Sequence, residues 1–241
     1  MAETIDAFYR GRVKVIQSRA GYRFAVDTPL LADFVETGPE DELCELGAGN
    51  GAVAVLLSLK PFRSLTTVEI QPALAALARR NAALNELGGR VEVVEADLRS
   101  WRPGRRFDVV LSNPPYIRNK TGPLSPSAEK TLAKHEIAGD VGDFLGSAAA
   151  LLKPEGRAYF VYPARREGDF RRAAAGAGLF VRLIRRVLPR PGEPPHLFLA
   201  RLERAPGPET ELPPLAIHAA EGGFTAEAEA IFEGRPRGVG A

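Results

Sequence analysis

The sequence predicts an α/β protein with a doubly wound, mostly parallel sheet that ends in an antiparallel hairpin. Strand-like and helix-like runs alternate from residue 41 to residue 175, as in a parallel sheet with helices on both faces. A glycine-rich turn follows the first strand-like run, at the edge where such sheets bind ligands. The last two strand-like runs, 179–188 and 196–201, are separated only by a turn rich in proline and glycine, which predicts the hairpin.

Turn and cap residues divide the core into its elements. Gly47 ends the first strand, Pro61 stops the first core helix, and Pro72 opens a second helix that Gly88 and Gly89 close. The other expected strands and helices follow from runs of apolar residues. The expected strands are 41–46, 65–70, 91–95, 107–112 and 157–162, and the expected helices are 52–59, 72–87, 137–152 and 165–175.

The chain is expected to form one large domain with an extension at each end. Its 241 residues suit a single α/β core, placed at residues 38–205. Residues 1–37 form an N-terminal arm and lid helix. Residues 206–241 form a C-terminal extension packed on the core, in which four prolines (206, 208, 213 and 214) mark a linker before a strand at 215–218 and a helix at 225–232.

The lid helix is expected to start near residue 28. Either Thr28 or Asp27 can cap it, with Pro29 in the first turn. The apolar side chains expected to pack on the sheet are Leu30, Leu31 and Phe34.

Composition argues against several classes of protein. No apolar run approaches the length needed to cross a membrane, and the N-terminus has no signal-peptide pattern. Cys44 is the only cysteine and lies in an apolar run, which predicts a core residue and argues against a disulfide or a cysteine-rich zinc site. The three histidines lack ligand spacing, so no metal is expected. These observations predict a cytoplasmic protein.

Basic residues are concentrated in two segments. The N-terminal arm contains Arg10, Arg12, Lys14, Arg19 and Arg23 with no acid among them, and residues 151–204 contain twelve basic and five acidic side chains. Nearly all are arginines, whose planar guanidinium suits phosphate binding and base stacking. The two segments either bind the backbone of an RNA, such as a tRNA, or form a solvent-exposed charged surface with no such role.

The turn Gly47-Ala48-Gly49-Asn50-Gly51 joins the first core strand to its helix. Glycines at these positions allow tight backbone angles and a close approach of a ligand to the main chain. By itself the signal is weak, because Gly47-x-Gly49-x-x-Ala52 also satisfies a dinucleotide-binding fingerprint.

Three acids surround this turn, and Asp97 and Glu45 favour S-adenosylmethionine over a dinucleotide. Glu69 does not discriminate, because that position serves NAD as well. Glu69 ends the second strand, where a carboxylate can accept both ribose hydroxyls, and Asp97, in Ala96-Asp97-Leu98, can accept an adenine amino group. Glu45 precedes the first glycine; a pyrophosphate would tolerate it poorly, whereas a cationic amine would be stabilised by it. The trio resembles the motifs of Rossmann-like class I methyltransferases. The resemblance implies that Glu45 and the glycines hold the methionine end, Glu69 the ribose, and Asp97 with Leu98 the adenine.

The most specific feature is Asn113-Pro114-Pro115-Tyr116, directly after the strand 107–112. An amide or aromatic amino nitrogen is a poor nucleophile because its lone pair is delocalised. If the Asn113 side-chain oxygen and the Pro114 carbonyl each accept one N–H, the lone pair can point at a methyl carbon, and the developing charge meets two fixed acceptors. Asn113 is therefore expected to lie against the cofactor as well, and Tyr116 offers a face on which a base can stack.

This turn resembles the NPPY signature of amino methyltransferases that act on adenine N6 or on glutamine N5 of release factors. Together with the arm Gly21-Tyr22-Arg23-Phe24 to Asp27, the chain resembles the bacterial tRNA(Val) (adenine-N6)-methyltransferase family over most of its length. The resemblance implies an adenine in a tRNA as substrate and places Asp27 beside the cofactor.

Other functions stay open from the sequence. They are protein glutamine N5 transfer, transfer to a small molecule or to rRNA guanine N2 and, more remotely, a non-catalytic RNA-binding module. About forty residues precede the core, too few for the separate helical domain usual in release-factor methyltransferases. An oxidoreductase is disfavoured because no Tyr-x-x-x-Lys pattern occurs. His135-Glu136 is either a solvated helix start or a substrate contact.

Overall fold

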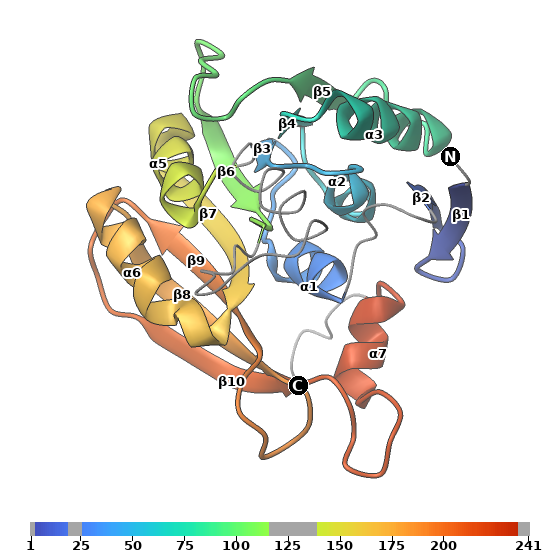
Figure 1. The fold of residues 1–241 in the computed structure, drawn as a ribbon, viewed down its shortest axis with the longest axis vertical. Helices are drawn as coiled ribbons and strands as arrows, with labels where there is room; N and C mark the ends of the chain where they lie inside the picture. The colour runs from blue at the N-terminus through green and yellow to red at the C-terminus, as the bar shows by residue number, and fades with distance from the viewer. Residues whose placement is uncertain (1–2, 19–25, 116–138, 236–241) are drawn as a thin grey trace, which may run out of the picture.

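The computed structural model describes residues 3–18, 26–115 and 139–235, and it confirms the doubly wound sheet (Figure 1). Eight strands lie in the order β10-β8-β9-β7-β6-β3-β4-β5. Neighbouring strands are parallel except at β9, which runs antiparallel to both β7 and β8. The predicted hairpin is therefore β8–β9.

The predicted core elements are present with small shifts in their ends. The strands are β3 (Glu42–Leu46), β4 (Ser64–Glu69), β5 (Val91–Glu95), β6 (Phe107–Ser112), β7 (Leu152–Pro163), β8 (Phe180–Leu188), β9 (Leu197–Glu203) and β10 (Thr210–Ala216). The helices are α1 (Asp27–Phe34), α2 (Ala52–Leu57), α3 (Pro72–Leu84), α5 (Val141–Leu151), α6 (Glu167–Gly176) and α7 (Ala226–Phe232), with a 3-10 turn η1 (Ala164–Arg166). Helix α5 begins after residue 140 because Asp140 and Asp143 form a capping box there.

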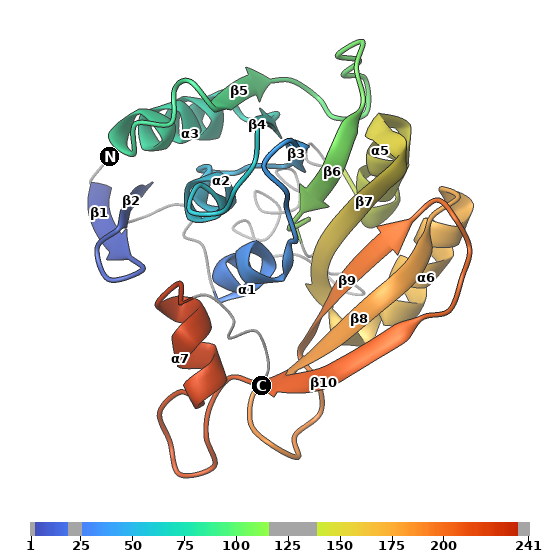
Figure 2. The same ribbon diagram turned by 180° about the vertical axis from the view of Figure 1, so that it is seen from behind.

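Alternate residues along the strands supply two cores, one on each face of the sheet. In β6, Val109 and Leu111 belong to one core and Val110 to the other, as the period-two geometry of a strand requires. The first core includes side chains of α1, α2 and α7, and the second includes those of α5 and α6. Figure 2 shows α1 and α2 on one face of the sheet and α5 and α6 on the other. Cys44 is fully buried in the second core, as predicted.

The N-terminal arm contains a hairpin that the sequence analysis did not predict. Strands β1 (Glu3–Phe8) and β2 (Val13–Ser18) pair antiparallel and form a separate two-stranded sheet. Their turn places Tyr9 (φ 52°), Arg10 (φ 59°) and Gly11 (φ 82°) in the left-handed region. Two of these are not glycine or asparagine, so the usual sequence signal of a hairpin turn is missing.

The lid helix lies where it was expected, but its predicted cap is wrong. Helix α1 starts at Asp27 after the N-cap residue Val26, and no side chain caps it. Asp27 and Thr28 are thus first-turn residues, and the negative charge of Asp27 there interacts favourably with the positive end of the helix dipole. Pro29 is in the first turn and the three expected apolar side chains are buried.

The proline-rich linker was also predicted wrongly in part. Strand β10 starts at Thr210 and contains Pro213 and Pro214, with a register shift between Leu212 and Leu215. Proline is tolerated there because β10 is the edge strand and pairs only with β8. The helix beyond it is confirmed: Thr225 caps α7 through its side chain.

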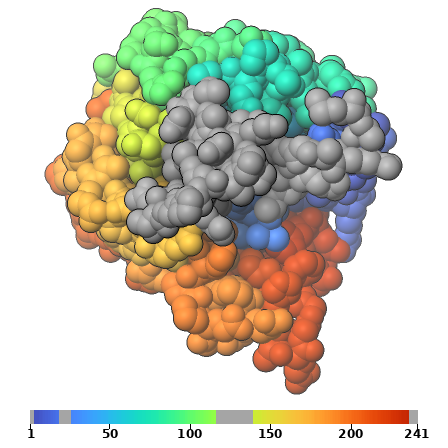
Figure 3. Space-filling model, viewed as in Figure 1, coloured from blue at the N-terminus to red at the C-terminus, as the bar shows by residue number. Residues whose placement is uncertain are grey.

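The turn of the N-terminal hairpin contacts the end of α7. Arg10 pairs with Glu233 at 2.7 Å, and Arg12 donates to the carbonyls of Glu233 and Gly234 just after α7. Helix α7 also lies against α1. In the space-filling view the red C-terminal segment accordingly borders the blue N-terminal one (Figure 3).

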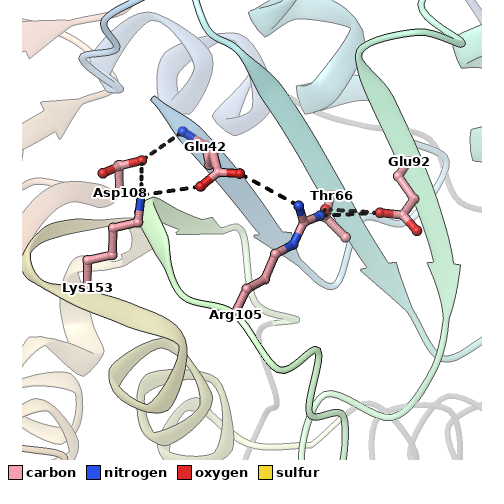
Figure 4. Close-up of polar contacts among 6 residues, drawn as sticks. All are labelled: Glu42, Thr66, Glu92, Arg105, Asp108 and Lys153. Atoms are coloured by element: carbon pink, nitrogen blue, oxygen red, sulfur yellow. Dashed lines mark hydrogen bonds and ion pairs between the residues drawn. The ribbon is translucent and has the colours of Figure 1, made fainter. Parts of the chain in front are cut away.

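Charged side chains near the amino ends of the strands tie the sheet together (Figure 4). Asp108 accepts from the Glu42 main-chain N–H at 2.9 Å and from Lys153 at 2.8 Å. Arg105 donates to Thr66 at 2.9 Å and pairs with Glu42 at 3.7 Å. These contacts join β3, β4, β6 and β7 near the amino ends of the strands, at the opposite edge of the sheet from the glycine turn.

Candidate active site

Strand register brings the expected site residues to one edge of the sheet. Leu46 at the end of β3 lies opposite Val68 of β4 and Ser112 of β6, and Glu69 lies opposite Glu95 of β5. Neighbouring strands are about 4.8 Å apart, so the four strand ends span about 14 Å. The glycine turn, Glu69, the Asp97 turn and the Asn113 turn therefore share this carboxyl edge.

The glycine turn has the backbone geometry that only glycine adopts easily. Gly47, Gly49 and Gly51 have φ values of 72°, 58° and 77°. A Cβ on Gly47 would lie 2.9 Å from the Phe144 ring, so the residue also allows α5 to pack closely. The N–H groups of Gly47 and Ala48 both donate to the Val68 carbonyl, at 2.9 and 3.1 Å, which anchors the start of the turn to β4.

Glu69 holds the middle of the same turn. One carboxylate oxygen accepts from the Gly49 N–H and the other from the Gln71 N–H, both at 2.8 Å. Burial raises the pKa of Glu69, although these main-chain hydrogen bonds favour its ionised form. The residue expected to bind ribose is therefore also a structural part of the loop, which the sequence did not indicate.

Glu45 is a buried carboxyl group with a free acceptor. It is 2% exposed, and its Oε2 atom has no hydrogen-bond partner among the residues that the structure describes. Burial, with a smaller contribution from the neighbouring Glu69, raises the pKa of Glu45 to about 8. A buried acid next to a tight glycine turn fits a ligand with a cationic group, as the methionine end of S-adenosylmethionine has.

Asp97 and Leu98 lie on the turn after β5. The Ala96 N–H donates to the Glu69 carbonyl at 3.1 Å, which places this turn beside Glu69. Asp97 is partly exposed and paired with Arg99 at 2.6 Å, and this side-chain hydrogen bond lowers the pKa of Asp97. Leu98 is buried and its carbonyl accepts from Ser147. An adenine at Asp97 would share the carboxylate with Arg99.

The turn after β6 begins beside the glycine turn. The Ser112 hydroxyl donates to the Leu46 carbonyl at 2.7 Å, which joins the ends of β6 and β3. Asn113 and Pro115 are half-buried and Pro114 is buried. Asn113 thus directly follows β6, the strand that pairs with β3 and lies beside the glycine turn.

One further predicted residue lies at the start of α1, and others lie outside the described residues. Asp27 is 9% exposed at the start of α1, where Thr28 donates to it at 3.5 Å. Tyr116 and His135-Glu136 lie outside the described residues, as do Arg19 and Arg23.

Most arginines of the segment 151–204 form ion pairs within the protein. Arg171 and Arg186 both bind Glu167, and Arg185 binds Glu227 at 2.7 Å. Others with acidic partners are Arg157, Arg166, Arg172, Arg182, Arg190 and Arg201. Arg157, Arg185 and Arg201 have partners outside the segment, namely Asp41, Glu227 and Glu36, so the positive balance of the segment is offset in part by acids from elsewhere in the chain.

Sequence reasoning missed Asn81. Its side chain is fully buried and donates to the carbonyl of Asn50, in the glycine turn, at 2.8 Å. A polar residue on the buried face of an otherwise apolar helix was the signal that could have identified it.

Neither a membrane-spanning helix nor a metal-binding cluster occurs in the described part of the chain. None of its helices is long and apolar enough to cross a membrane. Within the same ranges, no cluster of three or more His, Cys, Asp or Glu side chains is arranged to hold a metal ion.

Comparisons with known proteins agree with this geometry. A relative from Porphyromonas gingivalis, named tRNA1(Val) (adenine(37)-N6)-methyltransferase, is 27% identical, with 92% of this chain and 91% of the relative covered. A relative of the same name from Vibrio cholerae is 26% identical over 79% of each chain.

Solved structures share the fold. A predicted O-methyltransferase from Agrobacterium tumefaciens has a TM-score of 0.69 at 23% identity, covering 88% of this chain and 99% of that one. The 16S rRNA N2 guanine methyltransferase of T. thermophilus, solved with AdoMet and guanosine, has a TM-score of 0.56 at 17% identity, covering 85% and 50%. The model of the methyltransferase small domain family matches residues 22–168. The chain therefore belongs to the methyltransferase small domain family and is an enzyme whose cofactor is S-adenosylmethionine.

Proposed function

We propose that this enzyme methylates the exocyclic N6 amino group of an adenine in a tRNA. The observation that carries the proposal is the register of β3, β6 and β4, which places the Asn113 turn next to the glycine turn and Glu69. The names of the relatives from P. gingivalis and V. cholerae support adenine N6 and tRNA. With tRNA as substrate, we propose that the protein acts in the cytoplasm.

The chain's own residues would hold the cofactor in an extended position along the sheet edge. Glu45 and the turn at Gly47, Gly49 and Gly51 would hold the methionine end. The other contacts are assigned to Glu69 for the ribose, Asp97 and the Leu98 main chain for the adenine, and Asp27 of the arm. When bound, S-adenosylmethionine supplies an electrophilic methyl group on a positively charged sulfur.

Asn113 and Pro114 would orient the nitrogen that receives the methyl group. The Asn113 side-chain oxygen and the Pro114 carbonyl accept its two N–H groups, so the lone pair points away from both and toward the methyl carbon. Positive charge that develops on the nitrogen is stabilised by these two acceptors, which are held by the strand end and need no reorganisation. Tyr116 would stack on the base, which remains a prediction from the sequence.

The three-part division of the chain is also part of the proposal. We assign the arm and lid helix to residues 1–37, the catalytic core to 38–205 and the extension to 206–241. The contacts of Arg10 and Arg12 with the end of α7 support one change: the two extensions act as one unit packed beside the core. Because Arg12 donates to main-chain carbonyls within the protein, we assign no RNA contact to it.

Cofactor affinity is expected to rise between pH 5.5 and 7.5. Without the cofactor, Glu45 stays protonated up to its pKa of about 8. The cationic amine of the cofactor favours the ionised carboxylate, so Glu45 releases its proton when the cofactor binds. The affinity should rise by up to about tenfold per pH unit, until the amine loses its own charge near pH 8. Calorimetry across this range measures it.

Glu45→Gln is the matched control, because it removes the titrating group and keeps its shape. The pH dependence of binding should then be lost. A slope equal to that of the unsubstituted enzyme would remove Glu45 from the cofactor site. The same raised pKa of Glu45 also affects the stability of the fold. Between pH 4.5 and 8 the folded protein keeps a proton on Glu45 that the unfolded chain has lost, so the free energy of unfolding falls as the pH rises through this range.

Arg165 is the arginine we assign to the RNA backbone. It is exposed, has no acidic partner among the described residues, and follows β7, the strand beside β6, at the carboxyl edge. Arg165→Ala should weaken tRNA binding and lower the slope of log affinity against log salt by about 0.7–0.9, the value for one phosphate contact. Cofactor binding should not change.

Arg106→Ala is the control for this experiment. Arg106 is also exposed and has no acidic partner in the described segments, but it precedes β6 at the opposite edge. Its replacement should leave the salt slope unchanged. Equal effects of the two substitutions would contradict the assignment of Arg165.

The substrate itself is tested by radiolabelled methyl transfer to total tRNA with nucleoside analysis of the product. N6-methyladenosine in the tRNA is the expected result. Efficient methylation of a protein, with no product in tRNA and no salt dependence of binding, would favour glutamine N5 transfer and overturn the proposal.

A further inference from the structure

Helix α3 binds the N-terminal hairpin through two asparagines one turn apart. The Asn81 amide accepts from the Ile16 N–H at 2.6 Å and donates to the Ile16 carbonyl at 3.1 Å. The Asn85 amide accepts from the Lys14 N–H at 2.9 Å and donates to the Lys14 carbonyl at 2.7 Å. Each side chain thus pairs with one residue of β2 as a neighbouring strand would.

The two asparagines differ in one contact. Asn81 also donates to the Asn50 carbonyl at 2.8 Å, and Asn50 lies between Gly49 and Gly51. The additional contact of Asn85 is to the Asn81 carbonyl, within α3 itself. Of the two asparagines, Asn81 is therefore the one that links the hairpin directly to the glycine turn.

The glycine turn depends on this kind of support. Its first half is held by the Val68 carbonyl and by Glu69, both in β4. Its second half packs on α3, since a Cβ on Gly51 would lie 3.0 Å from that of Ala78. The buried Asn50 side chain has no hydrogen-bond partner among the described residues. The hydrogen bond from Asn81 to the Asn50 carbonyl is therefore the contact that fixes this residue of the turn.

We propose that Asn81 is a positioning residue for cofactor binding, through which the N-terminal hairpin helps to set the geometry of the glycine turn. Without Asn81, the Asn50 carbonyl loses its buried donor, and the hairpin loses its direct link to the turn. Loss of one such hydrogen bond changes an equilibrium constant by about fivefold. Because coupling is reciprocal, a ligand in the glycine turn should stabilise the hairpin by the same factor.

The matched pair Asn81→Ala and Asn85→Ala tests the proposal. Each variant loses two hydrogen bonds to β2, so both should lower the melting temperature. Only Asn81→Ala should raise the Kd for S-adenosylmethionine, by about fivefold, with kcat at saturating cofactor close to that of the unsubstituted enzyme. Unchanged cofactor binding in Asn81→Ala, or the same weakening in both variants, would overturn the proposal.

Hydrogen exchange on the unsubstituted protein provides an independent test if Asn81→Ala does not fold. Adding S-adenosylhomocysteine should slow exchange of the Ile16 amide by about fivefold, and Asn85→Ala should keep that response. No change at Ile16 on ligand binding would show that the hairpin and the turn are not coupled. The cofactor Kd and the exchange rate of the Ile16 amide are both measured without RNA, so these two outcomes are independent of the proposed substrate.

Discussion

Asn113→Ala is expected to reduce methyl transfer at saturating cofactor by about 10²–10³, the effect of removing one preorganised polar group from a transition state. The side-chain oxygen of Asn113 would accept an N–H of the nitrogen as that nitrogen becomes positively charged. The ground state needs this contact less than the transition state does, so the loss should fall on kcat. Single-turnover kinetics with saturating cofactor and tRNA measures it.

Cofactor affinity and a neighbouring substitution serve as controls for this result. The Kd for S-adenosylmethionine should remain within about threefold, because less than 1 kcal/mol of ground-state binding is expected from this amide. Ser112→Ala removes the hydrogen bond to the Leu46 carbonyl and leaves the amide in place, so its loss of activity should be much smaller. Normal turnover of Asn113→Ala would remove Asn113 from the mechanism.

Glu69→Ala is expected to weaken binding of S-adenosylmethionine by about 1–3 kcal/mol, or roughly 5–150-fold. Two losses contribute. The ribose hydroxyls lose a charged acceptor, and the Gly49 and Gln71 N–H groups lose the carboxylate that holds the turn. Isothermal calorimetry measures the affinity, and thermal unfolding measures the second loss.

Glu69→Gln separates the two contributions. Its single carbonyl oxygen can still accept one main-chain N–H, so the fold should be less affected than in Glu69→Ala. The charge-assisted hydrogen bonds to ribose would still be weakened. If calorimetry shows the same cofactor affinity in both variants as in the unsubstituted enzyme, Glu69 does not bind the cofactor.

The local patterns of the sequence determined the fold class and the order of the core elements. Strand and helix periods, Pro72 at a helix start and the glycines of the turn depend on neighbouring residues only. The sheet edge follows from them, because residues that come directly after parallel strands meet at one edge. For this reason Glu45, Glu69, Asp97 and Asn113 could be assigned to one site before any contact was known.

Tertiary structure alone decided which polar groups pair with one another. Arg12 donates to main-chain carbonyls at the end of α7, and Arg185 forms an ion pair with Glu227, so side chains expected to bind RNA make contacts within the protein. Asn81 joins β2 to the glycine turn across 65 and 31 positions of the chain. Such contacts depend on distances between segments far apart in sequence, and those distances are set by the packing of the helices on the sheet. Periodicity and composition contain no information about them.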